Sequence, residues 1–232
     1  MPMTKLIKLK LTWLLCGYLI VFSGSASATP SDDQCWTLMS QGKKVLAAND
    51  LHRALAIFKQ AQQVNPTDAR PFFWLGLTLD QLGDLKGAVQ AYADCLDLAK
   101  QRNLDCPELR IDLGNVLCKL NYFKQAVYDY QRALEINPSL TVVHMYLAKA
   151  LIDSGQYQEA MGQLDLYSRL SIKDPTIPYL RALALKGLGN SGAALTQAQD
   201  FLDALPAEML NTPLAQKGRL LEVELKRQTS VP

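Results

Sequence analysis

The stretch of sequence that decides the fold covers residues 69–100 and reads ARPFFWLGLTLDQLGDLKGAVQAYADCLDLAK. The same pattern returns at residues 107–138, which read PELRIDLGNVLCKLNYFKQAVYDYQRALEINP. A Leu-Gly pair and an Ala-x-x-x-Tyr motif occur at the same places in both stretches. Two stretches that place small and large residues at matching offsets predict a structural unit that the chain repeats.

The repeat extends over most of the chain. At a period of about 34 residues, with one insertion at 103–106, five segments align. They cover residues 35–68, 69–102, 107–140, 141–174 and 175–208. The same small residue occupies one place in every segment, namely Ala54, Ala88, Ala126, Ala160 and Ala194. Large residues stand at fixed offsets around it, and small against large is how facing helices interlock.

Each segment is interrupted near its middle by Gly or Asn. The residues at this place are Asn49, Gly83, Asn121, Gly155 and Gly189. Both residue types tolerate the left-handed backbone conformation that ends a helix. Each segment is therefore predicted to be a helix, a tight turn and a second helix, and a period of this length predicts that the segments stack as a solenoid.

These residues resemble the tetratricopeptide-repeat family. The family pattern of Leu-Gly, Ala, aromatic and Pro is matched in the third segment by Leu113, Gly114, Ala126, Tyr130, Ala133 and Pro138, and in the second by Leu75, Gly76, Ala88 and Tyr92. The fifth segment departs from it, because Arg181 replaces the usual Leu and Ala198 the usual aromatic residue. The resemblance implies an all-α fold, a right-handed α-solenoid of about five helix-turn-helix repeats.

Both ends of the repeat region have a predicted role. At the C-terminal end, residues 209–232 are expected to form a capping helix and a tail, with Thr212 as the helix cap and Pro213 in the first turn. Its apolar stripe would cover the last repeat. At the N-terminal end, residues 29–34 are expected to be a short leader.

Residues 1–28 are predicted to be a secretory signal peptide. Three lysines precede an apolar run, Leu11 to Phe22, which is followed by small residues ending at Ala28. The run is shorter than the roughly 20 residues of a membrane-spanning helix, so we expect cleavage near Ala28 and a periplasmic or secreted protein. The alternative is an uncleaved segment that anchors the chain in a membrane.

Charge and cysteine content limit the classes of partner and chemistry. The formal net charge is +2 and becomes −1 once the signal peptide is removed, so no basic field for nucleic acid is expected. Four cysteines remain, and they match no metal or haem motif. Cys95 and Cys118 are the one pair considered for a disulfide, and the alternative is that Cys95 is a buried thiol.

One side of the first helices carries apolar residues where polar ones are expected. At about 100° per residue, the core positions of each first helix gather on one side, and the opposite side of a surface helix is normally polar. The resemblance implies that this opposite side lines the concave groove in which the family holds peptides. The expected partner-binding residues are Trp36, Lys43, Phe73, Trp74, Leu77, Ile111, Asn115, Met145, Tyr146, Lys149, Tyr179 and Leu183.

Two readings of this surface stay open. Met39 and Leu180 are expected to extend the apolar surface, which would bind a protein or peptide partner. Alternatively, neighbouring first helices bury much of it against one another. The carboxylate clamp of the family is not expected, because Met39 and Trp74 stand where its Lys and Asn would be, although Asn115 matches one place.

No catalytic, metal or cofactor site is expected. The glycines at 187, 189 and 192 spell a dinucleotide-binding pattern, but they lie in a turn between helices with no strand before it. His52 and His144 belong to different repeats and cannot share a metal. The predicted function is that of an exported adaptor that binds a partner polypeptide, without enzymatic activity. The alternative is a structural or assembly subunit of an envelope complex, anchored in the membrane by an uncleaved N-terminal helix.

Overall fold

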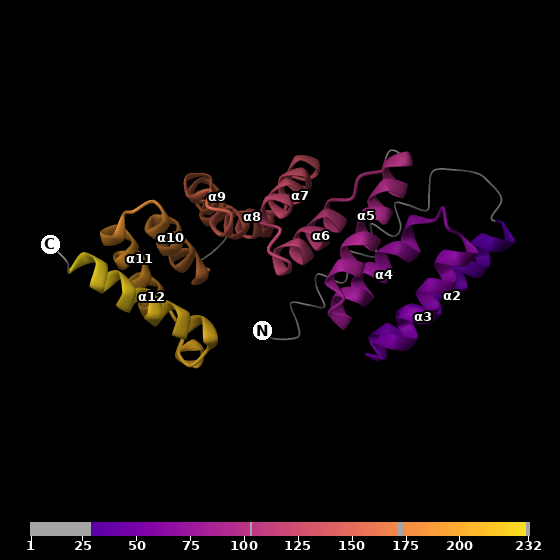
Figure 1. Cartoon of the computed structure of the whole chain (residues 1–232), viewed down its shortest axis with the longest axis horizontal. Helices are drawn as coiled ribbons and strands as arrows, with labels where there is room; N and C mark the ends of the chain where they lie inside the picture. The colour runs from indigo at the N-terminus through magenta and orange to yellow at the C-terminus, as the bar shows by residue number, and fades with distance from the viewer. Residues whose placement is uncertain (1–28, 103, 171–173, 231–232) are drawn as a thin grey trace. The chain divides into compact units, whose positions relative to one another are not determined.

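The computed structural model describes residues 29–102, 104–170 and 174–230 (Figure 1). Every regular element in these ranges is a helix, which confirms the predicted all-α solenoid class. The predicted signal peptide, residues 1–28, lies outside the described residues. None of the described helices is long and apolar enough to cross a membrane.

The helices follow one another as hairpins. The first hairpins are formed by α2 (Pro30–Ala47) with α3 (Leu51–Val64) and by α4 (Ala69–Leu82) with α5 (Leu85–Gln101). The next helices are α6 (Pro107–Lys119), α7 (Phe123–Ile136), α8 (Thr141–Asp153) and α9 (Tyr157–Leu170). The last are α10 (Thr176–Gly187), α11 (Ser191–Asp203), the short 3-10 helix η1 (Ala207–Met209) and α12 (Pro213–Thr229).

The chain divides into two compact units between Asn121 and Tyr122. Unit 1 contains α2 to α6, and unit 2 contains α7 to α12. The division falls inside the third segment, residues 107–140, at the turn between its two helices. Each unit has its own buried core.

Small residues on one helix face large residues on the next, as the sequence predicts. In the first hairpin a Cβ added to Gly42 would lie 2.5 Å from the ring of Phe58, and in the second a Cβ on Gly76 would lie 2.6 Å from the ring of Tyr92. Ala54 is fully buried in the same way. The period of small residues therefore records where two helices approach closely.

The turn positions have the predicted backbone conformation. Positive φ angles occur at Asn49 (63°), Gly83 (83°), Asn121 (62°), Gly155 (82°) and Gly189 (78°). A left-handed residue satisfies the last carbonyl groups of a helix and reverses the chain. In unit 1 this places α2 against α3 and α4 against α5 (Figure 1).

The fifth segment compensates for its departures from the family pattern. Ala198 stands at the usual aromatic position and Phe201, fully buried, lies one turn later. The ring of Phe201 packs at 5.2 Å from the ring of Tyr179, and a Cβ on Gly218 of α12 would lie 2.4 Å from it. The aromatic residue has moved along α11, and the glycine of α12 makes room for it.

The two ends of the repeat region differ from each other in how well they were predicted. The expected leader, residues 29–34, belongs to the first helix, because α2 already begins at Pro30. Thr29 is its N-cap, and its backbone N–H donates to the Asp32 carboxylate at 3.0 Å in a capping box. At the other end Thr212 caps α12 by accepting from the backbone N–H of Ala215 at 3.3 Å, as expected.

Candidate partner-binding surface

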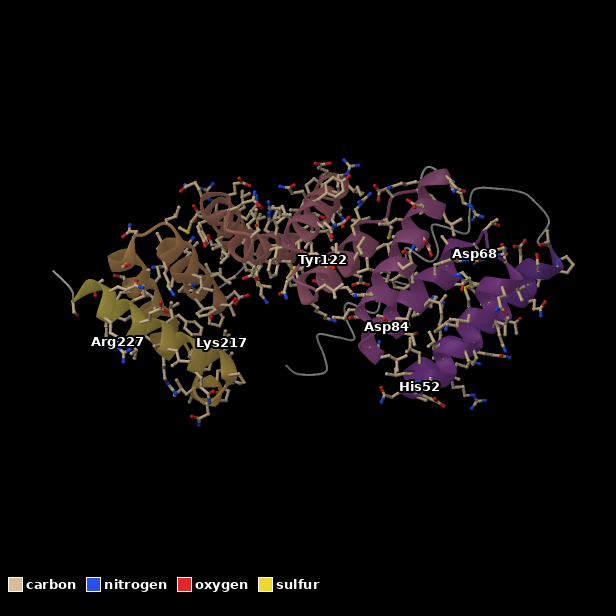
Figure 2. All side chains as sticks on the ribbon, in the orientation of Figure 1. His52, Asp68, Asp84, Tyr122, Lys217 and Arg227 are labelled. Atoms are coloured by element: carbon tan, nitrogen blue, oxygen red, sulfur yellow. The ribbon has the colours of Figure 1, made fainter. Side chains whose placement is uncertain are left out.

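The expected partner-binding residues lie on the first helices of both units. In unit 1 we call them the first-helix face of unit 1, and they are Trp36, Lys43, Phe73, Trp74, Leu77, Ile111 and Asn115 on α2, α4 and α6. In unit 2 they lie on α8 and α10 and are Met145, Tyr146, Lys149, Tyr179 and Leu183. Side chains cover the helices of both units (Figure 2).

Cations and indole rings alternate where α2 meets α4. The Lys43 ammonium lies 4.7 Å from the ring centroid of Trp74 and 5.7 Å from that of Trp36. The Arg70 guanidinium lies 5.5 Å from the Trp36 ring. Trp36 is 52% exposed, a high value for an indole. We call Trp36, Lys43, Arg70 and Trp74 the indole cluster.

Arg70 is held in the indole cluster by Asp68, the N-cap of α4, which is labelled in Figure 2. The Asp68 carboxylate accepts from the Arg70 backbone N–H at 2.9 Å and from its Nη2 at 2.6 Å. The side chain of Asp68 is 3% exposed, so this ion pair is well shielded from water. Sequence reasoning missed Arg70, because a cation in the first turn of a helix carries no periodic signal.

Burial and a neighbouring cation act against the charge on Lys43. The pKa of Lys43 is lowered, first by burial and then by the positive charge of Arg70. Both effects disfavour the protonated ammonium. The faces of the two indoles offset part of this cost, because they attract cations.

Part of the surface also supports the core. Trp74 stacks on Phe58 at 5.9 Å and meets Phe73 edge to face at 5.1 Å. Met39 is 1% exposed and Leu180 is 7% exposed, so the expectation that they extend the surface is wrong. Met39 packs with Cys35 and with Ala61 of α3 in one core cluster.

Carboxylates gather where α4 meets α6. Lys119 donates to Asp80 at 2.5 Å. Burial, and next the negative charge of Asp80, raise the pKa of Asp112 to about 7, while Lys119 acts in the opposite direction. In the described part of the chain Asp112 accepts no hydrogen bond, whereas Asn115, one turn further along α6, does interact with a neighbour.

The corresponding residues of unit 2 are only partly accessible. Tyr146 lies with its ring 6.0 Å from that of Tyr130, and Met145 accepts a weak hydrogen bond from Thr176 at 3.8 Å. Tyr179 and Leu183 pack against the core around Ala182. Lys149 is exposed. The first helices of unit 2 therefore present a less open surface than the indole cluster does.

Arg181 occupies the place of the usual leucine and is only partly satisfied. Its Nη2 donates to Asp165 at 2.7 Å and to Ser168 at 3.3 Å, whereas its buried Nε has no hydrogen-bond partner. Together with Leu185 and residues of α9 and α11 it lines a cavity of about 410 Å³. The departure from the family pattern pointed to this position, but not to its ion pair.

Cys95 and His144 are both held by contacts to neighbouring groups. The Cys95 thiol donates to the carbonyl of Ala69 at 3.1 Å and is not bridged to Cys118. Burial raises the pKa of Cys95 to about 12. His144 Nδ1 lies 2.7 Å from the side-chain oxygen of Gln163, which fits a packing role. No group of three or more metal-ligating side chains occurs among the described residues.

Known proteins share this architecture. The structure of the protein YrrB superposes on this chain with a TM-score of 0.69 at 20% sequence identity. The superposition covers 87% of this chain and 100% of YrrB. MamA of Desulfovibrio magneticus RS-1 superposes with a TM-score of 0.67 at 15% identity, covering 77% of this chain and 97% of that one.

A sequence relative and two family matches add to this likeness. The human protein DnaJ homolog subfamily C member 3 is 28% identical over 166 residues, which are 71% of this chain but 27% of the relative. The chain thus spans about a quarter of the length of that protein. Models described as tetratricopeptide repeat match residues 40–103 and 121–184, one in each unit. The chain belongs to the tetratricopeptide-repeat family, and its fold is that of a protein–protein interaction adaptor.

Proposed function

We propose that this chain is an adaptor that binds a segment of a partner polypeptide on the first-helix face of unit 1. The observation that carries the proposal is the indole cluster. Trp36 is 52% exposed and lies beside a half-buried cation on the side of α2 that a surface helix normally keeps polar. Exposed aromatic surface of this kind is typical of protein interaction sites.

The chemistry of the face suits a bound segment. Indole rings supply large anchoring surfaces at low conformational cost, and binding energy usually concentrates at such residues. Lys43 and Asn115 can orient the segment through charge and hydrogen bonding. YrrB, which shares the fold, is described as having an unusual peptide-binding site, and this likeness supports a peptide ligand here. Tyr146 and Lys149, which belong to unit 2, would be the residues of that unit that contact a partner.

A single exposed ring tests the proposal. Trp36→Ala is expected to weaken partner binding at least about tenfold, the effect of removing an interface anchor. Because the ring is 52% exposed, the change should leave the folded state largely intact. Crosslinking in cells identifies the partner, and titration of the purified partner against the chain gives the affinity.

The control is Tyr128→Ala, which removes an aromatic residue of 58% exposure from α7, outside the proposed surface. It should bind like the unchanged chain. Equal losses in both variants, or no loss with Trp36→Ala, would argue against this surface as the binding site.

We further propose that the chain is exported, with residues 1–28 removed as a signal peptide. The support is the order of lysines, apolar run and small residues, together with the N-cap at Thr29, which would stand at the new terminus. Sequencing of the mature N-terminus should give Thr29. A mature protein that still carries the apolar run would instead support the membrane-anchored alternative.

A further inference from the structure

Lys43 is a half-buried cation without a carboxylate partner among the described residues. No carboxylate lies within ion-pair distance of its ammonium in the described parts of the chain, and its recorded contacts are the rings of Trp36 and Trp74. The carboxylates nearby are already engaged. Asp68 is paired with Arg70 at 2.6 Å, and Asp32 accepts from the Asn65 amide at 2.7 Å and from the Thr29 backbone in the capping box of α2.

An anion that binds beside Lys43 would stabilise its protonated form. Burial and Arg70 both lower the pKa of Lys43, so the protonated ammonium is the form under strain. Indole faces attract a cation but bring no net negative charge. A carboxylate beside Lys43 would restore the balance, and the exposed ring of Trp36 could cover an apolar side chain next to it.

Carboxylates gather elsewhere on the first helices of unit 1, where α4 meets α6. Asp80 lies on α4, and Asp112 and Glu108 lie on α6. The negative charges of Asp80 and Glu108 both raise the pKa of Asp112, although Asp80 is also paired with Lys119. An acidic side chain placed there would meet repulsion. Repulsion near these carboxylates and attraction near Lys43 would favour placing an acidic side chain beside Lys43.

We propose that the partner segment carries an acidic side chain next to an apolar one, and that the acidic side chain pairs with Lys43 while the apolar one packs on Trp36. This rests on the proposed function and adds the chemistry of the partner. The acid is a side chain within the segment rather than a chain terminus, because Met39 and Trp74 occupy the places where a terminal-carboxylate clamp needs polar groups.

Peptide selection tests this directly. Random peptides about twelve residues long are displayed on phage and selected on the purified full chain. The selected peptides are then synthesised with acetylated N-termini and amidated C-termini, and their affinities are measured by fluorescence anisotropy. We expect Asp or Glu beside an apolar residue in the selected set.

Charge variants supply the decisive comparison. Lys43→Glu should weaken these peptides at least about tenfold and redirect selection toward Lys and Arg. Lys43→Gln should weaken binding of the same peptides without redirecting the selection toward basic peptides. This second variant keeps the test valid if Lys43→Glu fails to fold. The control is Lys59→Glu, the same charge change at an exposed residue of α3, and it should leave the affinities unchanged.

Each outcome decides the inference. The inference is overturned if the selected peptides show no preference for Asp or Glu, or if Lys43→Glu leaves their affinities unchanged. Binding that requires a free C-terminal carboxylate would also overturn it. If those peptides still depend on Trp36, the proposed function survives. A selection that yields no peptide dependent on Trp36 overturns the proposed function as well.

Discussion

At the scale of single residues, packing in unit 1 depends on the absence of one methyl group at a few places. A Cβ on Gly76 would lie 2.6 Å from two atoms of the Tyr92 ring, and Tyr92 is 1% exposed and cannot move outward easily. Gly76→Ala should therefore lower the free energy of unfolding by about 1 to 3 kcal/mol, the usual cost of overpacking a core.

Chemical denaturation measures the change, and Gly162→Ala is the matched control. Gly162 lies inside α9 and a Cβ there meets nothing within 4 Å. The same substitution should stabilise the chain by about 0.5 to 1 kcal/mol through helix propensity alone. If Gly76→Ala behaved like this control, the close approach of α4 and α5 would not constrain the sequence.

Asp112 makes stability depend on pH. Its pKa rises from 3.8 to about 7 in the folded chain, so the folded state binds more protons than the unfolded state between these values. Stability should then fall as the pH rises through this window, because ionisation is disfavoured in the folded state. Asp112→Asn should remove this slope and stabilise the chain at pH above about 7 by roughly 1 to 3 kcal/mol.

Denaturation midpoints across the pH range report the effect. The control is Asp97→Asn on α5, where the side chain is 73% exposed and pairs with Lys100 at the surface. It should change stability by less than about 1 kcal/mol at any pH. A slope that persists in Asp112→Asn would assign the pH dependence to other groups.

At the scale of elements, each helix depends on its cap as well as on its buried stripe. Thr212 begins α12 by accepting from the backbone N–H of Ala215 at 3.3 Å. Thr212→Ala should cost about 1 kcal/mol, the usual loss for an N-cap. Thermal unfolding followed by circular dichroism measures it.

Thr229→Ala is the control at the other end of α12. Its hydroxyl donates to the carbonyl of Leu225 at 3.0 Å within the helix, and this bond adds little to a helix that already has its backbone pairs. A loss equal to that of Thr212→Ala would mean that the position of the threonine in the helix is irrelevant, contrary to the capping argument.

At the scale of the whole molecule, stability should be local to each unit. The chain divides between Asn121 and Tyr122, and repeat proteins gain stability from each element and its neighbours. Leu225→Ala removes a fully buried side chain of α12, which should cost about 2 to 5 kcal/mol within unit 2. Hydrogen exchange should then accelerate in α11 and α10, which pack next to α12, and stay unchanged in α2 to α5.

Gly76→Ala provides the reciprocal experiment for that prediction. Because Gly76 packs in the core of unit 1, its effect on exchange should be largest in α4 and α5 and absent from α11 and α12. Uniform acceleration along the chain in either variant would indicate a single cooperative unit and contradict the division.

The sequence alone determined the helix hairpins, their turns and the family. It could do so because these features depend on local and repeated requirements: Asn49 and Gly83 tolerate a left-handed backbone, and Gly42 or Ala54 leaves space for a facing ring. The side of each first helix that carries aromatic residues also followed from the helical period. The helical start at Pro30 was not predicted, because the repeat alignment begins only at Cys35.

Tertiary structure alone decided which residues of that side are accessible. Helical periodicity gives the direction of a side chain but not how closely the next helix approaches, so Met39 and Leu180 were expected at the surface and are buried. Arg70 reaches Trp36 from a neighbouring helix, and Asp112 owes its raised pKa first to burial and then to the charge of Asp80 on α4. Burial and charge pairing between helices depend on distances in space, and a repeat pattern along the chain does not contain them.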